Sequence, residues 1–260
     1  MEKENILALY DQEQRMNIEY PGTRKEQRPH VIRTISETGG LHFILYSNLR
    51  GVDIDAVIAT EKAYFGNLGR VKWKVYEHDF PPDLRQRLAV HGFEIDEPEA
   101  VMVLDLEEAA PWNVPELPPG VILRRLDDPA QLDDVRQVEE TVWAEDMPWI
   151  SENLAADLAV PDYVSIYAAY VAERPVCAGW INFHANGRFA DLWGGSTLVE
   201  HRKKGLYAAI LARRVQEARA RGYRFLVTDA SPMSRPILAK HGFEQLTRAW
   251  DCSWGRDTRE

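Results

Sequence analysis

One segment of this chain occurs twice. LRQRLAVHGFE at 84–94 returns in altered form as SRPILAKHGFE at 234–244, with the two His-Gly-Phe triplets 150 residues apart. Each copy follows an apolar, strand-like run, at 71–79 and at 223–230, and another such run comes after it. Because the flanking elements keep the same order, the repeat predicts a duplicated structural unit. The alternative is that the triplet recurs by chance, with its glycine serving as an ordinary helix C-cap.

The segment between the two copies has an unusual composition, and we predict a domain boundary there. Residues 107–120 read EEAAPWNVPELPPG, in which four prolines and a glycine interrupt all periodicity. Such a stretch is typical of a linker. We therefore predict one domain over 1–110 and a second over 120–260. Strands alternate with helices in both, which indicates an α+β (layered α/β) fold with a mixed central sheet flanked by helices.

Composition excludes several other classes of protein. With 260 residues and 45% apolar side chains, the chain can form a substantial core, which argues against collagen-like, disulfide-scaffold and largely disordered proteins. Cys177 and Cys252 are the two cysteines, and no Cys/His spacing predicts a metal site. No window approaches the roughly 18 apolar residues of a spanning helix, so we expect a cytoplasmic protein without a membrane partner. The net charge of −10 disfavours nucleic acid as a partner.

The most informative segment is ADLWGGSTLVEHRKKGLYAAILARRVQEARARG, at 190–222. A strand enters, two glycines follow at 194 and 195, and a helix begins beside Arg-Lys-Lys-Gly at 202–205. Residues 202–224 contain eight Lys/Arg and one acid. Cations at the first turn of a helix oppose its dipole and are unfavourable unless an anion binds there, so this junction predicts an anion site. We interpret most of the later arginines, at 213, 214, 219, 221 and 224, as a solvated helix face.

The pattern Arg202-x-x-Gly205-x-Tyr207, placed between a strand and a helix, resembles the pyrophosphate loop of the GNAT superfamily of acyl-CoA-dependent N-acyltransferases. The strand, short helix and strand that follow resemble the rest of that family's core, so that the resemblance covers roughly 120–254. It implies that acetyl-CoA (coenzyme A) binds in a cleft between two splayed parallel strands. The cofactor-binding residues it implies are Thr197, Leu198, Val199, Arg202, Lys203, Lys204, Gly205, Leu206, Tyr207 and Thr228.

The sequence departs from the family's pattern in two places. Tyr207 occupies the position of a small residue in the loop, and Leu238 stands where many members carry the tyrosine that protonates the departing thiolate. Tyr207 and Ser234 are our substitute candidates for that acid. In the first half, SNLRGVDIDAVIAT occupies the place of the loop, with Asp53 and Asp55 at the helix start. Acids there suit the dipole but repel phosphates, so we interpret 1–110 as a degenerate GNAT-like domain, with an unrelated α+β domain as the alternative.

Transfer of an acyl group to an amine needs a proton acceptor, and Asp191 is our candidate base. It lies on the strand that enters the loop, where the resemblance places a base carboxylate in one branch of the family; an exposed acid at a strand end is the alternative. Trp193 shares its face by alternation. His184 is a weaker candidate, because a lone His after a strand is usually a turn residue, and we interpret Asp229 as the end of its strand.

The acceptor is expected, by the resemblance, to contact the first two helices of the second half. Residues 127–162 contain eleven Asp/Glu and one Lys/Arg. Trp143 and Trp149 lie among these acids. A surface that combines acidic and aromatic side chains would attract a primary or quaternary ammonium group. A solvated acidic helix is the alternative. The predicted substrate-binding residues are Trp143, Asp146, Trp149 and Trp193.

The resemblance thus implies an N-acetyltransferase that transfers an acetyl group from acetyl-CoA to the amine of a small molecule or peptide, by direct attack in a ternary complex. The alternative is a non-catalytic acyl-CoA-binding or regulatory module, which Leu238 and the degenerate half favour. Nucleic-acid binding is a more distant reading, because the basic residues concentrate at one loop and helix rather than in a broad stripe.

Overall fold

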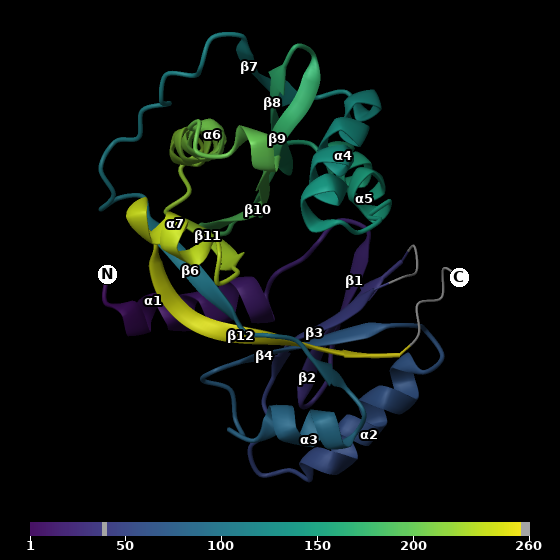
Figure 1. Ribbon diagram of the computed structural model, residues 1–260. Coiled ribbons are helices and arrows are strands. Elements are labelled where there is room, and N and C mark those ends of the chain that lie inside the picture. The colour runs from purple at the N-terminus through teal and green to yellow at the C-terminus, as the bar shows by residue number, and fades with distance from the viewer. Residues whose placement is uncertain (38–40, 256–260) are drawn as a thin grey trace. The chain divides into compact units, whose positions relative to one another are not determined.

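The computed structural model describes residues 1–37 and 41–255 (Figure 1). Contacts divide the chain into two compact units: unit 1 comprises Met1–Val103 and Asp229–Glu260, and unit 2 comprises Leu104–Thr228. The divisions fall inside two strands, β6 (Glu99–Asp105) and β11 (Phe225–Ala230). Each unit has a hydrophobic core of its own.

Unit 1 is built on a mixed sheet with the strand order β1-β2-β3-β4-β12-β6, in which β3 and β4 are parallel and the other neighbours antiparallel. The short strand β5 also pairs with β12. The strands are β1 (Thr23–Gln27), β2 (Val31–Ser36), β3 (His42–Ser47), β4 (Val71–Tyr76), β5 (Glu94–Ile95) and β12 (Glu244–Trp254). The helices are α1 (Lys3–Tyr10), which continues into a π-helical turn at Asp11–Met16, α2 (Ile54–Phe65), α3 (Leu84–Val90) and α7 (Arg235–Lys240).

The parallel pair β3 and β4 requires a crossover, and α2 provides it. Helix α2 begins after Asp53, whose Oδ1 accepts a hydrogen bond from the backbone N–H of Ala56 at 3.1 Å. Ile58 and Phe65, two helical turns apart, are fully buried and pack in one cluster with Trp73 of β4. The predicted strand–helix–strand order of the first half is therefore confirmed here.

The segments that make up unit 1 differ from the domain boundary that we predict at 110–120. Strand β12 pairs with β4, where Ala249 lies opposite Tyr76, and with β5, where Ser253 lies opposite Glu94. It also contributes Trp250 and Cys252 to the core cluster of unit 1. Both copies of the His-Gly-Phe repeat consequently lie in unit 1, and the segment 120–260 does not form one compact unit, because the ladder of β12 joins it to the N-terminal strands.

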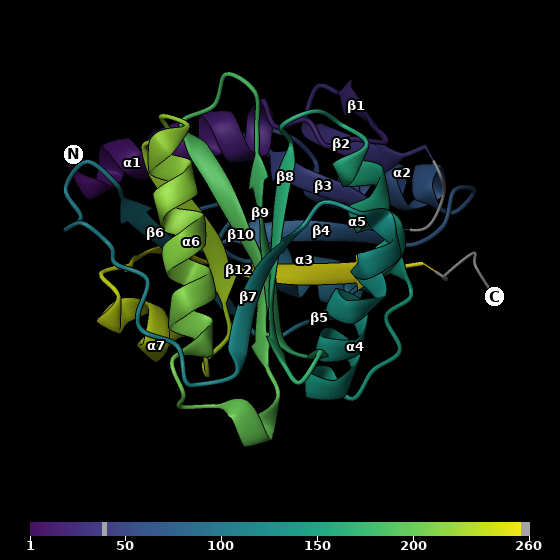
Figure 2. The ribbon, with the colours of Figure 1, turned by 90° about the horizontal axis from the view of Figure 1, so that it is seen from above.

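Unit 2 has the strand order β11-β10-β9-β8-β7, in which β10 and β11 are parallel and the other neighbours antiparallel. The strands are β7 (Val121–Leu126), β8 (Val164–Val171), β9 (Arg174–Phe183), β10 (Phe189–Thr197) and β11. Helices α4 (Leu132–Trp143) and α5 (Trp149–Leu158) cover one face, and α6 (Leu206–Ala220) covers the other (Figure 2). Hydrophobic periodicity predicts helices at 132–144 and 152–158 and strands at 164–171, 176–183 and 189–199, and the observed elements agree with these to within a few residues. In the described part of the chain, no helix combines the length and the apolar character needed to cross a membrane.

The predicted linker is attached to α6. The Arg219 side chain donates through Nη2 to the carbonyl oxygens of Leu106 and Ala110, at 3.0 and 3.1 Å. One turn earlier, Gln216 Nε2 donates to the carbonyl oxygen of Trp112 at 2.8 Å. Prolines leave this segment without a regular ladder, and these side-chain donors satisfy its carbonyl groups instead.

Candidate functional site

Strands β10 and β11 separate partway along β10. Their ladder runs from Phe189 opposite Phe225 to Asp191 opposite Val227 and then stops, whereas β10 continues to Thr197. Beyond Asp191, this edge of β10 has no partner from β11 in the ladder of unit 2. The free N–H and C=O groups of such an edge can pair with an extended ligand.

A bulge follows the point of separation. The register between β10 and β9 shifts between Gly194 and Ser196, and the two glycines have φ of +64° and +99°. A Cβ at Gly194 would lie 2.5 Å from the Trp180 ring, and a Cβ at Gly195 would lie 2.9 Å from the Tyr207 ring. Both positions therefore require glycine, for backbone conformation and for space.

The loop after β10 has the geometry of an anion site. Lys203 and Gly205 both lie in the left-handed region, with φ of +62° and +79°. That conformation costs a lysine roughly 1 kcal/mol. Helix α6 begins after Gly205 without a side-chain cap, so the N–H groups of its first turn lack intrahelical acceptors. Backbone N–H groups arranged in this way form a concavity that binds phosphate or carboxylate.

The charges at this loop have no carboxylate partner among residues 1–37 and 41–255. Arg202, Lys203 and Lys204 are exposed, and within the described residues none of the three pairs with a carboxylate. Arg202 instead donates through Nε to the carbonyl oxygen of Thr197 at 3.1 Å, which folds the loop back towards the end of β10. The helix dipole adds to this positive potential. The predicted loop residues 202–207 are thus gathered around one electropositive helix start.

The other predicted cofactor-binding residues lie along the two separating strands. Leu198 is buried, and its N–H donates to the carbonyl oxygen of Val176 in β9 at 2.9 Å, so this amide is already used. Val199 is exposed at the beginning of a 3₁₀ turn, Val199–His201. Thr228 follows Val227, the residue that lies opposite Asp191.

The side chain of Tyr207 explains how the loop accommodates a residue larger than the family's pattern. Its ring packs against Gly195 in the bulge, and burial raises the pKa of its hydroxyl. Ser234, the other candidate acid, lies in unit 1 directly before α7, with its Oγ 3.2 Å from Ser231 Oγ. Leu238 is buried in the same helix.

Asp191 and His184 form a buried pair. Only 7% of each residue is exposed, and His184 Nε2 lies 2.9 Å from Asp191 Oδ2. His184 does begin a turn, since its carbonyl oxygen accepts from the N–H of Gly187, but its ring faces Asp191. The interpretation of Asp191 as an exposed acid is therefore wrong. Asp191 Oδ1 is also buried and has no hydrogen-bond partner among the described residues.

The predicted acceptor residues are largely exposed tryptophans. Trp143, Trp149 and Trp193 expose 50%, 44% and 44% of their surfaces, and Asp146 is exposed before α5. Trp193 lies opposite Trp180 in β9, and Trp180 belongs to the core cluster formed with α4 and α5. Directly opposed residues share a face, so Trp193 is directed to the side of the sheet that α4 and α5 cover.

Two buried charges were not predicted as site residues. Glu139 of α4 is 4% exposed and accepts from Ser196 Oγ at 2.7 Å. Arg214 of α6 is 1% exposed and donates through Nη1 to the carbonyl oxygens of Trp180 and Trp193, both at 3.1 Å. Its assignment to a solvated helix face is therefore wrong. The available signal was position: Glu139 follows Val135 by four residues and Arg214 follows Ile210 by four, which places each charge in an apolar stripe.

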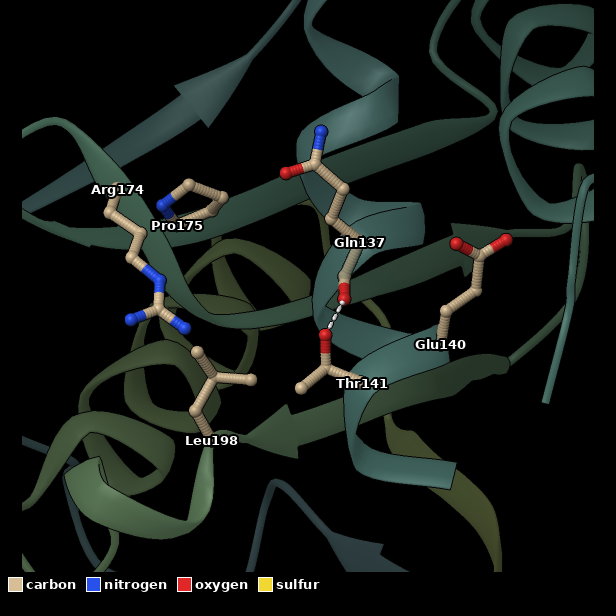
Figure 3. Close-up of a pocket in the computed structure, with 6 residues that line it drawn as sticks. All are labelled: Gln137, Glu140, Thr141, Arg174, Pro175 and Leu198. Atoms are coloured by element: carbon tan, nitrogen blue, oxygen red, sulfur yellow. Dashed lines mark hydrogen bonds between the residues drawn. The ribbon is translucent and has the colours of Figure 1, made fainter. Parts of the chain in front are cut away.

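A small cavity lies on the α4 side of unit 2 (Figure 3). Its volume is about 170 Å³, and it is lined by Gln137, Glu140, Thr141, Arg174, Pro175 and Leu198. Thr141 closes one side by donating its hydroxyl to the carbonyl oxygen of Gln137 at 2.6 Å. Pockets that enclose small-molecule ligands usually measure about 300–1,000 Å³. The candidate site is therefore the open strand edge and loop, not this cavity.

Comparison with known proteins places this geometry in a fold family. No protein-family model and no curated protein sequence matches the chain. Among solved structures, it is similar to a GCN5-related N-acetyltransferase (GNAT) from Kribbella flavida, with 16% identity, a TM-score of 0.67, and coverage of 98% of this chain and 95% of that one. The chain has the GNAT fold.

Two further GNAT structures support this assignment. A tandem GNAT protein from the clavulanic acid biosynthesis pathway, solved without acetyl-CoA, is 14% identical with a TM-score of 0.63, covering 94% of this chain and 86% of that one. A GNAT from Sphaerobacter thermophilus is 13% identical with a TM-score of 0.59, covering 88% and 82%. The predicted fold class, tandem GNAT-like with mixed sheets flanked by helices, is confirmed. Similarity at these identities concerns the GNAT fold and not the activity.

Proposed function

We propose that the chain is an acyltransferase that binds acetyl-CoA at the Arg202–Tyr207 loop and transfers the acetyl group to an amine. The observation that carries the proposal is the loop itself. Its uncapped helix start, its two left-handed residues and its three unpaired cations suit a diphosphate, which needs both N–H donors and positive charge. Acetyl-CoA supplies the acetyl group in activated form, as a thioester.

Other residues of unit 2 would bind the rest of the cofactor and transfer protons. The free edge of β10 after Asp191 offers backbone groups to an extended ligand arm. In the transfer, the amine nitrogen forms the C–N bond as the C–S bond breaks, and the thiolate leaves. The proton lost by the amine passes to the Asp191–His184 pair, either directly or through water. Tyr207 is the candidate within unit 2 for returning a proton to the thiolate.

Binding is tested by thermal unfolding with coenzyme A. A ligand at 100 times its Kd stabilises the folded chain by about 2.7 kcal/mol, so coenzyme A should raise the Tm by several degrees. Gly205→Glu should abolish this shift, because it places a carboxylate in the anion site and a side chain at φ +79°. Gly222→Glu is the matched control: Gly222 has φ +82° and open space, but it lies after the C-terminal end of the same helix.

The controls separate two failures. No Tm shift of the native chain at millimolar coenzyme A would remove the basis of the proposal. Equal loss of the shift in both glycine variants would show that backbone strain alone causes the loss.

The non-catalytic binding module is the second candidate, favoured by Leu238 at the position of the usual acid. Coenzyme A binding without thiol release from acetyl-CoA, over a broad panel of amines, would favour that module.

A further inference from the structure

Glu139 is a buried carboxylate at the β10 bulge. It projects from α4, with 4% of the residue exposed, on the side of the sheet towards which Trp193 is directed. Its Oε1 atom would lie 3.0 Å from a Cβ placed at Gly194. The bulge thus brings the backbone of β10 against this side chain, next to the point where β10 and β11 separate.

The hydrogen bonds of Glu139 leave one oxygen unused. Oε2 accepts from Ser196 Oγ at 2.7 Å and from the indole N–H of Trp143 at 3.0 Å. Oε1 is buried and has no hydrogen-bond partner among the described residues. A carboxylate has about four acceptor sites, so Oε1 keeps acceptor capacity that none of the described residues uses.

The charge of Glu139 is also unpaired. In the described part of the chain it forms no ion pair. Arg214 is a buried cation whose charge acts on Glu139, but its Nη1 donates to two carbonyl oxygens. Burial raises the pKa of Glu139, because it removes the ionised form from water. The ionised form of a buried carboxylate without an ion-pair partner is unfavourable, and a cationic ligand would stabilise that form.

We propose that Glu139 binds the ammonium group of the acceptor, and that the acceptor is therefore a cationic amine. This inference rests on the proposed acyltransferase function and assigns its acceptor site. The Trp143 indole, which is half exposed, donates to Glu139 Oε2 and so connects this carboxylate with a side chain that reaches the surface. Its aromatic face offers a cation a second favourable contact. Glu139 is a positioning residue in this scheme, whereas the Asp191–His184 pair receives the proton.

The test measures binding to the full chain saturated with coenzyme A. Methylammonium, n-butylammonium and phenethylammonium are titrated calorimetrically at pH 7.5, with n-butanol and 2-phenylethanol as uncharged counterparts. We expect the ammonium compounds to bind and the alcohols to bind at least 10-fold more weakly. Glu139→Gln should weaken ammonium binding at least 10-fold while leaving the stabilisation by coenzyme A unchanged, because the loop at 202–207 is untouched.

Two control variants separate charge from architecture. Glu140→Gln alters the next residue, whose carboxylate is held by Arg136 and by the N–H of Met147, and should change ammonium affinity less than 2-fold. Ser196→Ala removes a hydrogen bond of Glu139 but keeps its charge, and should also retain binding. If Glu139→Gln does not fold, Glu139→Asp keeps the charge and should still prefer ammonium compounds over alcohols.

Several outcomes would overturn the inference. One is binding of coenzyme A without binding of any of the three ammonium compounds, which leaves the proposed function intact. Another is an equal loss of ammonium binding in Ser196→Ala and Glu139→Gln, since Glu139 would then only brace the bulge. Failure of coenzyme A itself to bind would instead contradict the proposed function on which the inference rests.

Discussion

At the scale of single residues, the chemistry that we propose for unit 2 depends on Asp191, a carboxylate that is buried. Asp191 pairs with His184, and Asp157 of α5 interacts with the same histidine. Burial raises the pKa of Asp157 to about 6. Sequence reasoning selected Asp191 by its place on the strand, but the pairing with His184 joins two segments whose contact depends on the β9–β10 hairpin.

The proton-accepting role of Asp191 gives the first residue-scale prediction. Asp191→Asn should lower the rate of thiol release from acetyl-CoA roughly 10²–10⁴-fold, because the amide cannot accept the proton. Stabilisation by coenzyme A should remain, since the loop at 202–207 is unaltered. Thiol release is followed with a chromogenic disulfide. Loss of both binding and turnover would mark Asp191 as a structural residue, and unchanged turnover would remove it from the reaction.

Asp157 gives a prediction about stability and pH. Its folded-state pKa of about 6 lies above the value of 3.8 for a free side chain, so the folded chain binds the proton more tightly than the unfolded chain does. This contribution favours folding below about pH 4 and is lost as the pH rises through 6. Asp157→Asn should therefore stabilise the chain by about 1–3 kcal/mol at pH 7.5 and by much less at pH 4.5. Chemical unfolding at both pH values measures this, and an equal gain at both would contradict it.

At the scale of elements, two helix starts show what a short sequence motif can convey. Helix α2 follows Asp53, which caps it, and carries Asp55 in its first turn. Helix α6 follows Gly205 with no cap and basic residues before it. The first helix start has a side-chain cap, whereas the second has none and suits the external anion that we propose. Capping and charge are local properties, which is why the sequence alone distinguishes the start of α2 from the start of α6.

Elements set by local periodicity were predicted well, and features set by distant contacts were not. The helix expected at 132–144 and the strands expected at 164–171 and 176–183 agree with α4, β8 and β9. The pairing of β12 with β4 could not be predicted, because it depends on a ladder between residues about 180 positions apart. Glu139 and Arg214 were missed because a charge in an apolar stripe reveals burial only when the partner surface is known.

At the scale of the whole molecule, the tandem fold raises the question of how many cofactor sites the chain carries. Both halves share the GNAT-like order of elements, but the segment of unit 1 that corresponds to the loop, SNLRGVDIDA at 47–56, has acids where the other has cations. At its helix start, the backbone N–H of Ala56 donates to the Asp53 carboxylate. We propose that unit 1 has lost cofactor binding and that the chain has one coenzyme A site.

This proposal predicts the stoichiometry of binding. Calorimetric titration of the full chain should give one coenzyme A per chain, and a structure with coenzyme A should show it beside 197–207 and not at 47–56. Gly205→Glu should reduce the stoichiometry to zero, because no second site remains to bind the diphosphate. Asp53→Ser keeps a capping oxygen but removes the charge, so it should retain both folding and a stoichiometry of one. Two equivalents in the native chain, or one remaining in Gly205→Glu, would show that unit 1 still binds the cofactor.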